Sequence, residues 1–253
     1  MGILDVKNCT KRFGGLVAVR NLDMSLKQGD LYGLIGPNGA GKTTIFNLIT
    51  GVYAPDEGSI ELDGKAIHKH KASSIAKLGM SRTFQNIRLF RSMTVRENVT
   101  LARHMRKEQG LFDAIVRTGR LKREEDAIGR DALELLKIFN LDKRADEAAV
   151  NLPYGSQRRL EIARALATKP KVLLLDEPAA GMNPLESMEL MHLIRSIRDK
   201  FQITVLLVEH NMKVVMGVCE KIQVIDYGET IALGTPKEIR DNPKVIEAYL
   251  GGA

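Results

Sequence analysis

The segment GPNGAGKT at residues 36–43 limits the possible folds of this chain more than any other part of its sequence. It matches the pattern G-x-x-x-x-G-K-[ST], with the apolar run LYGLI before it and the helical pattern TTIFNLIT after it. Glycines allow a turn to wrap around phosphate groups, and the first N–H groups of the following helix then point at the ligand. The segment therefore predicts a strand, a phosphate-binding loop and a helix, in that order.

Each residue type in this loop suits phosphate binding. The glycines free the backbone, so that N–H groups from Asn38 to Thr44 point inward, and Lys42 is expected to reach the β- and γ-phosphates of a nucleotide. Thr43 is expected to offer its hydroxyl to Mg²⁺. The predicted nucleotide-binding residues of the loop are Gly36, Pro37, Asn38, Gly39, Ala40, Gly41, Lys42, Thr43 and Thr44.

A second predicted strand, in KVLLLDEP at residues 171–178, ends in two carboxylates. In a parallel sheet Asp176 would lie beside the phosphate loop, where it can hold the Mg²⁺ shell through a water molecule. Glu177 would face the γ-phosphate, where a carboxylate can act as general base on the attacking water. The pair predicts nucleotide hydrolysis, whereas a kinase would place a second substrate at this position.

The run ITVLLVEHNM at residues 203–212 predicts a third strand, which ends in Glu209 and His210. A single histidine is usually a packed or surface residue. At the end of a strand parallel to the Asp176 strand, however, a histidine is placed to contact the γ-phosphate. We therefore predict that His210 senses the γ-phosphate.

Short apolar runs rich in β-branched residues alternate with longer helical patterns, which indicates an α/β fold. Continuous apolar runs at 31–35, 171–175 and 203–208 predict buried central strands of a mostly parallel sheet. Glycine turns near Glu61 and within residues 222–233 are typical of an antiparallel β edge.

The middle of the chain, from about residue 86 to residue 151, is rich in Arg, Lys, Glu, Ala and Leu and contains no convincing strand. We interpret it as an α-helical subdomain inserted into the sheet domain. The expected organisation is a single nucleotide-binding domain over residues 1–253, with a catalytic α/β core at 1–85 and 160–253 and a helical subdomain at 86–159.

Hydropathy and charge indicate where the chain is located and which partners it has. No stretch approaches the roughly 18 apolar residues of a membrane span, and the first ten residues lack the pattern of a signal peptide, so a cytoplasmic chain is expected. The 38 basic and 31 acidic residues give a net charge of +7, which favours an acidic partner such as nucleic acid, a lipid surface or a nucleotide. The basic stretch at 103–123 is interpreted as a solvated helix face, with a nucleic-acid contact as the alternative.

Taken in order, the phosphate loop, LPYGSQRRLEIARAL, DEP and EH resemble the ATP-binding subunits of ABC transporters, and the resemblance covers essentially the whole chain. Several stretches are similar, more narrowly, to the ATPases of high-affinity branched-chain amino-acid importers: FGGLVAV, RTFQNIRLF, LDEPAAGMNP, EHNMKVVM and GTPKEIRDNPKVIEAYLG. The resemblance implies a RecA-like P-loop domain of the ABC type.

The resemblance also implies roles that the residues alone do not. Phe13 falls where an aromatic ring stacks on adenine, and Gln85 falls where a glutamine touches Mg²⁺ and the attacking water and moves with the transmembrane subunits. Residues 181–183 match a loop that crosses the interface between two ATPases, with Asn183 where Asp is more usual.

Residues 152–156 match the Leu-Ser-Gly-Gly-Gln signature, which contacts the γ-phosphate held by the other protomer of an ATP-sandwich dimer. The five residues are Leu152, Pro153, Tyr154, Gly155 and Ser156. Pro153 replaces the signature serine, so a hydroxyl and a backbone N–H are both absent there. We interpret the segment as a working but weakened signature, and hypothesise that it completes the slower of two unequal ATP sites.

The function implied by this resemblance is ATP hydrolysis, with ATP and Mg²⁺, that drives an ABC importer for branched-chain amino acids. Expected partners are two transmembrane permease subunits, a second related ATPase or a second copy of this chain, and indirectly a substrate-binding protein. The expected location is peripheral, at the cytoplasmic face of the inner (plasma) membrane. Two alternatives stay open: an ATPase of a urea, amide or lipopolysaccharide ABC system, and a soluble ABC ATPase that associates with nucleic acid.

Overall fold

The computed structural model describes residues 2–104 and 119–250 and divides the chain into two compact units. The first unit combines Met1–Gln85 with Lys171–Ala253, and the second is Asn86–Pro170. The sequence placed the end of the helical part at residue 159. The unit ends later because α6, Tyr154–Ala167, is one continuous helix that a boundary at 159 would cut.

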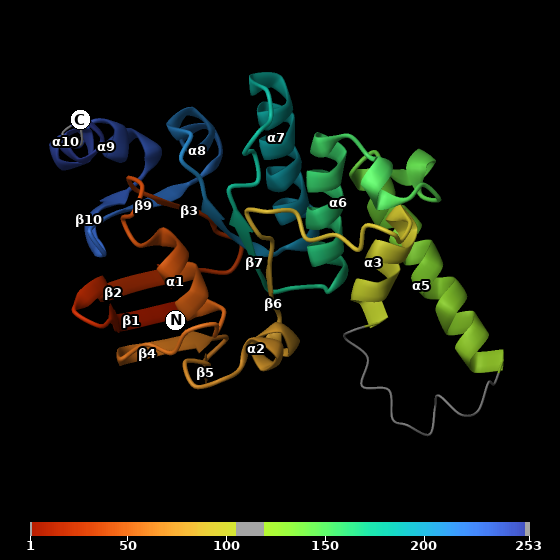
Figure 1. The fold of residues 1–253 in the computed structure, drawn as a ribbon, viewed down its shortest axis with the longest axis horizontal. Coiled ribbons are helices and arrows are strands. Elements are labelled where there is room, and N and C mark those ends of the chain that lie inside the picture. Colours follow the sequence, from red (N-terminus) through yellow and green to blue (C-terminus); the bar gives the residue numbers. More distant parts are fainter. Residues whose placement is uncertain (1, 105–118, 251–253) are drawn as a thin grey trace. The chain divides into compact units, whose positions relative to one another are not determined.

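Among the described residues, six strands of the first unit form one sheet in the order β10-β9-β3-β8-β7-β6 (Figure 1). All neighbours pair in parallel except β10 with β9. The strands are β3 (Leu31–Ile35), β6 (Met80–Arg82), β7 (Val172–Asp176), β8 (Thr204–Val208), β9 (Lys221–Asp226) and β10 (Glu229–Gly234). Every residue of β3, β7 and β8 is buried, as expected for central strands covered on both faces.

Four further strands of the described residues form an antiparallel sheet in the order β2-β1-β4-β5. They are β1 (Leu4–Phe13), β2 (Leu16–Leu26), β4 (Glu57–Leu62) and β5 (Lys65–Ala66). Asp63 and Gly64 join β4 to β5, and both have positive φ (50° and 72°), as a two-residue type I′ hairpin turn requires. The predicted antiparallel edges are therefore present in both sheets.

The helices of the first unit are α1 (Lys42–Ile49), α2 (Ala72–Leu78), α7 (Pro184–Phe201), α8 (Met212–Val218), α9 (Pro236–Arg240) and α10 (Pro243–Leu250). Helix α1 unites the two sheets, because its buried side chains Ile45, Phe46, Leu48 and Ile49 belong to a core that contains residues from β1, β2, β3, β7 and β8. Helices α8, α9 and α10 gather beside β9 and β10 (Figure 1). The phosphate loop is thus anchored at both ends, by a buried strand and a buried helix.

The second unit contains the helices α3 (Val95–His104), α5 (Gly119–Ile138) and α6, and the 3₁₀ turns η1 (Asp142–Arg144) and η2 (Ala149–Asn151). Asn98 is fully buried and fixes the segment before α3: it accepts the Phe90 N–H at 2.9 Å and donates to the Phe90 carbonyl at 3.0 Å. Residues 105–118 of the basic stretch lie outside the described part of the chain. Within residues 2–104 and 119–250, no helix combines the length and the apolar composition needed to cross a membrane.

Candidate nucleotide-binding and catalytic site

The loop between β3 and α1 has room only for glycine at two positions. Gly41 has a φ of 104°, and a Cβ there would come within 2.6 Å of the Ala18 carbonyl oxygen. A Cβ on Gly36 would come within 2.0 Å of the Ile225 carbonyl oxygen. The loop therefore lies tightly against backbone of β2 and β9, and a side chain at either position would displace it.

The Lys42 side chain is folded into this loop. It is 8% exposed, and its Nζ donates to the carbonyl oxygens of Gly36 at 2.6 Å and Pro37 at 2.8 Å. Burial lowers the Lys42 pKa, and the negative charges of Glu177 and Asp176 oppose that effect. The ammonium group is thus held in the loop whose N–H groups begin α1, an arrangement suited to a bound anion.

Asp176 and Glu177 lie where the sequence predicted, at the end of β7. Asp176 pairs with Val208 of β8, is 7% exposed, and forms an ion pair of 2.8 Å with Arg82. Glu177 follows with a φ of 46°, in the left-handed region that residues other than glycine rarely adopt, and donates its N–H to the Val208 carbonyl at 2.9 Å. Backbone strain of this kind clusters at functional sites.

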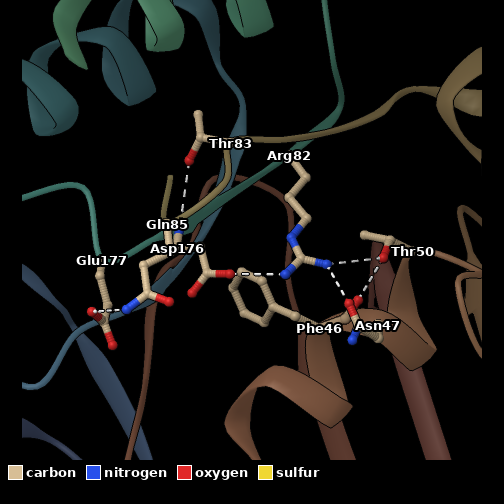
Figure 2. A network of polar contacts seen from close by, with 8 residues as sticks. All are labelled: Phe46, Asn47, Thr50, Arg82, Thr83, Gln85, Asp176 and Glu177. Carbon is tan, nitrogen blue, oxygen red and sulfur yellow. Dashed lines mark hydrogen bonds and ion pairs between the residues drawn. The ribbon is translucent and has the colours of Figure 1, made fainter. Parts of the chain in front are cut away.

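Gln85 and His210 both approach the same carboxylate oxygen of Glu177. The Gln85 Nε2 donates to Oε2 at 3.0 Å, and the His210 Nδ1 lies 3.5 Å from it (Figure 2 shows Gln85 and Glu177). The three side chains come from segments that follow β6, β7 and β8. The structure therefore brings together all three predicted catalytic residues.

The other predicted residues of the first unit are distributed around the loop. Thr43 is exposed and Thr44 half-buried in the first turn of α1, while Asn38 and Gly39 are exposed and Ala40 is buried. Phe13 ends β1 with 41% of its surface exposed, and its ring meets Tyr53 edge to face at 5.1 Å. The Phe13 ring is thus a surface feature rather than part of the core.

The predicted signature residues form the start of α6 in the second unit. Leu152 is buried, Pro153 is the N-cap, and Tyr154, Gly155 and Ser156 form the first turn. The first N–H to form a helical hydrogen bond in α6 is that of Gln157, which bonds to the Pro153 carbonyl at 2.9 Å. The N–H groups of Tyr154, Gly155 and Ser156 come before it and are not part of the i to i−4 hydrogen bonding of the helix. Such N–H groups are suited to an anion.

Tyr154, one of these predicted signature residues, bonds through its hydroxyl to a residue one turn further along the helix. It accepts hydrogen bonds from Nε and Nη2 of Arg158 at 3.1 and 3.0 Å, and Arg158 pairs in turn with Glu161 at 3.4 Å. Arg158 and Glu161 are buried, with 3% and 2% of their surface exposed. The Tyr154 side chain thus contacts a buried ion pair on α6.

Asn183, the residue found in place of the more usual Asp, is the N-cap of α7. Its side chain accepts the Glu186 N–H at 2.9 Å, and the Glu186 carboxylate accepts the Asn183 N–H at 3.1 Å, which is a complete capping box. Asn and Asp cap helices about equally well. The presence of Asn183 in place of Asp therefore leaves the cap of α7 intact.

Sequence reasoning assigned no role to Arg82 or Glu209, which the structure places at the site. Glu209 is 1% exposed and accepts the Ala179 N–H at 2.9 Å. Burial raises the Glu209 pKa, against the smaller effects of that hydrogen bond and of His210. Glu209 thereby links the end of β8 to the segment between Glu177 and α7.

Glu209→Gln is expected to raise the midpoint of thermal unfolding at pH 8, because the amide can still accept the Ala179 N–H but carries no buried charge. A carboxyl whose folded-state pKa is raised favours folding most at low pH and loses that contribution as the pH rises. The increase in the unfolding midpoint of Glu209→Gln over the wild type should therefore become smaller as the pH falls from 8 to 5. The exposed Glu134→Gln is the control, and a gain equal at both pH values would contradict the assignment.

The phosphate loop, the strand-end carboxylates and the mostly parallel sheet define the class as a P-loop nucleotide-binding protein. The family model described as ABC transporter matches residues 19–180, and the model described as branched-chain amino acid ATP-binding cassette transporter matches residues 229–253. The chain belongs to the ABC transporter family, as an ATP-binding cassette. The sequence resemblance is confirmed.

Individual relatives match along the whole chain. The high-affinity branched-chain amino acid transport ATP-binding protein LivG of Salmonella typhimurium is 48% identical over 99% of this chain and 98% of its own length. The corresponding protein BraF of Pseudomonas aeruginosa is 47% identical with the same coverage. The crystal structure of an ABC transporter cassette in its ADP conformation is 32% identical, covers 99% of both chains and gives a TM-score of 0.86, which confirms the predicted fold class.

Proposed function

We propose that this chain is the ATP-hydrolysing, energy-coupling subunit of an importer for branched-chain amino acids. The observation that carries the proposal is the 48% identity to LivG along 99% of the chain, together with the match of residues 229–253 to the branched-chain amino acid family model. The lipopolysaccharide export protein LptB of Haemophilus influenzae is 34% identical, which makes an exporter ATPase the weaker alternative.

The loop residues would hold the triphosphate of ATP. Lys42 would exchange its carbonyl partners for the β- and γ-phosphates, with the N–H groups from Asn38 to Thr44 around them, and Phe13 would stack on the adenine. Thr43, Gln85 and Asp176 offer a hydroxyl, an amide and a carboxylate, the oxygen ligands that Mg²⁺ prefers, with Asp176 acting through a water molecule. When bound, Mg²⁺ neutralises charge on the β- and γ-phosphates.

Glu177 would take the proton of the attacking water. Gln85 and His210, both within reach of its Oε2, hold the carboxylate in place before the reaction and can orient the water and the γ-phosphate. The low exposure of Lys42 and Asp176 reduces solvent screening at the site, so that their charges act more strongly than they would in water.

We propose two transmembrane permease subunits as partners, at the cytoplasmic face of the inner (plasma) membrane, together with a second related ATPase. In this assembly the first turn of α6, from Tyr154 to Ser156, would face the nucleotide held by the second ATPase. Pro153 offers neither a hydroxyl nor an N–H at its cap position, so the site that it completes would be the slower of two.

Pro153→Ser is expected to raise ATP hydrolysis by the assembled complex about tenfold, because one restored hydrogen bond to a charged phosphate contributes about 1.5–3 kcal/mol. Phosphate release per complex is the measurement. The matched control is Pro243→Ser, the same change at the exposed first residue of α10. Unchanged or reduced ATP turnover by the Pro153→Ser complex would contradict the hypothesis of a weakened signature.

The function is tested by purifying the tagged chain from its native membrane in mild detergent and identifying what accompanies it. Two multi-spanning proteins and a second, related ATPase are expected. One repeated permease with no second ATPase would keep transport but make the two ATP sites identical. Recovery of ribosomes or nucleic acid alone would overturn the transport function.

A further inference from the structure

We propose that Arg82 is a positioning residue for ATP hydrolysis, which sets the orientation of the Asp176 carboxylate and ties it to the helix of the phosphate loop. The inference deepens the function proposed above and rests on it, since it assigns Asp176 to the metal shell. Arg82 itself would touch neither substrate nor metal. Its effect would pass through Asp176.

The contacts of Arg82 bridge two parts of the site (Figure 2). Its Nη2 donates to Oδ2 of Asp176 at 2.8 Å, and its Nη1 donates to Oδ1 of Asn47 at 2.7 Å. The side chains of Arg82 and Asp176 are only 9% and 10% exposed. Because the two guanidinium nitrogens are rigidly linked, the position of α1 fixes the position of this carboxylate oxygen.

Two aromatic rings hold the guanidinium in place. Its Cζ lies 5.2 Å from the ring centroid of Phe46, on α1, and 5.2 Å from that of Phe84. The Arg82 Nε is buried and lacks a hydrogen-bond partner among the described residues. A buried ion pair with an unsatisfied N–H contributes little net stability compared with an apolar core. The arrangement is better explained by geometry than by stability.

The short segment from Arg82 to Gln85 reaches both carboxylates of the site. Arg82 pairs in register with Leu174 of β7, and the Thr83 hydroxyl accepts the Asp176 N–H at 3.4 Å. Gln85, three residues beyond Arg82, contacts Glu177. A displacement of this segment would therefore change the positions of the Asp176 and Glu177 carboxylates together.

The test is the affinity for ATP with and without Mg²⁺, measured by calorimetry on the full chain. For Arg82→Met we expect the tightening caused by Mg²⁺ to fall about tenfold relative to the wild type, while ATP affinity without Mg²⁺ changes less than twofold. Arg240→Met, which removes an exposed arginine paired with Asp241, is the matched control and should leave both affinities unchanged.

A second variant separates positioning from folding. Asn47→Ala leaves the Arg82–Asp176 pair intact but removes the 2.7 Å partner of Arg82 Nη1, which then keeps only its longer contact of 3.5 Å to Thr50 Oγ1. The tightening of ATP binding by Mg²⁺ should therefore fall about threefold in Asn47→Ala, and the double variant, Arg82→Met with Asn47→Ala, should lose no more of it than Arg82→Met alone. If the affinities of Arg82→Met for ATP with and without Mg²⁺ fall by the same factor, then Arg82 has only a structural role. An unchanged or increased effect of Mg²⁺ would equally overturn the inference.

The failure of this inference is distinguishable from the failure of the proposed function. A wild-type chain that binds no ATP, with or without Mg²⁺, would contradict the ATPase itself. A wild-type chain whose ATP affinity depends on Mg²⁺, beside an Arg82→Met variant that matches it, would contradict only the role of Arg82.

Discussion

Glu177→Gln is expected to reduce ATP hydrolysis by about 10²–10⁴-fold while ATP still binds, since this is the range that general-base catalysis contributes. The amide of glutamine can still accept the hydrogen bond that Gln85 Nε2 now makes at 3.0 Å, so the geometry of the site should persist without its proton acceptor. Phosphate release and ATP affinity are measured on the same preparation of the assembled complex.

The control for Glu177 is Glu134→Gln, which removes an exposed carboxylate on α5 that pairs with Lys137. It should hydrolyse ATP at the wild-type rate. Normal hydrolysis by Glu177→Gln would show that another group takes the proton. Loss of ATP binding in the same variant would instead assign Glu177 to nucleotide binding and contradict its role as a base.

Lys42→Met is expected to weaken ATP binding by about 100-fold or more, because losing charge-assisted hydrogen bonds to two phosphates costs about 3 kcal/mol in total. Methionine preserves much of the stem of the side chain, which is 8% exposed, and so limits the loss of packing. Affinity for ATP is measured by calorimetry, with circular dichroism to verify the fold.

The control for Lys42 is Lys137→Met, the same change at an exposed position of α5. Its ATP affinity should match that of the wild type. If Lys42→Met retained wild-type affinity, then the ammonium that now bonds to the Gly36 and Pro37 carbonyls would be a structural group rather than a phosphate ligand.

The sequence predicted the parts of the fold whose signals are local. Strands β3, β7 and β8 lie within one residue of their predicted bounds, because a continuous apolar run is typical of a central parallel strand. The two carboxylates after β7 and His210 after β8 lie together because parallel strands deliver their carboxyl ends to the same edge of the sheet. The roles of these side chains stay predictions.

The features that the sequence missed depend on distant contacts. Strands β1 and β2 mix charged and apolar residues with irregular register, and β6 has only three residues, so their patterns are weak. Arg82 has no local signal of burial, since its ion-pair partner Asp176 lies 94 residues away. The antiparallel edge predicted at residues 222–233 is present, because β10 pairs antiparallel with β9, but the sequence did not show that β9 itself pairs in parallel with β3.

The most direct test of the central claim is the uptake of radiolabelled leucine by native cells from which this chain has been deleted. High-affinity uptake should be lost, and should return with the wild-type chain but not with Glu177→Gln, while uptake of urea and export of lipopolysaccharide stay unchanged. Normal leucine uptake in the deleted cells, with a defect in one of the other two processes, would contradict the assignment to branched-chain amino acids.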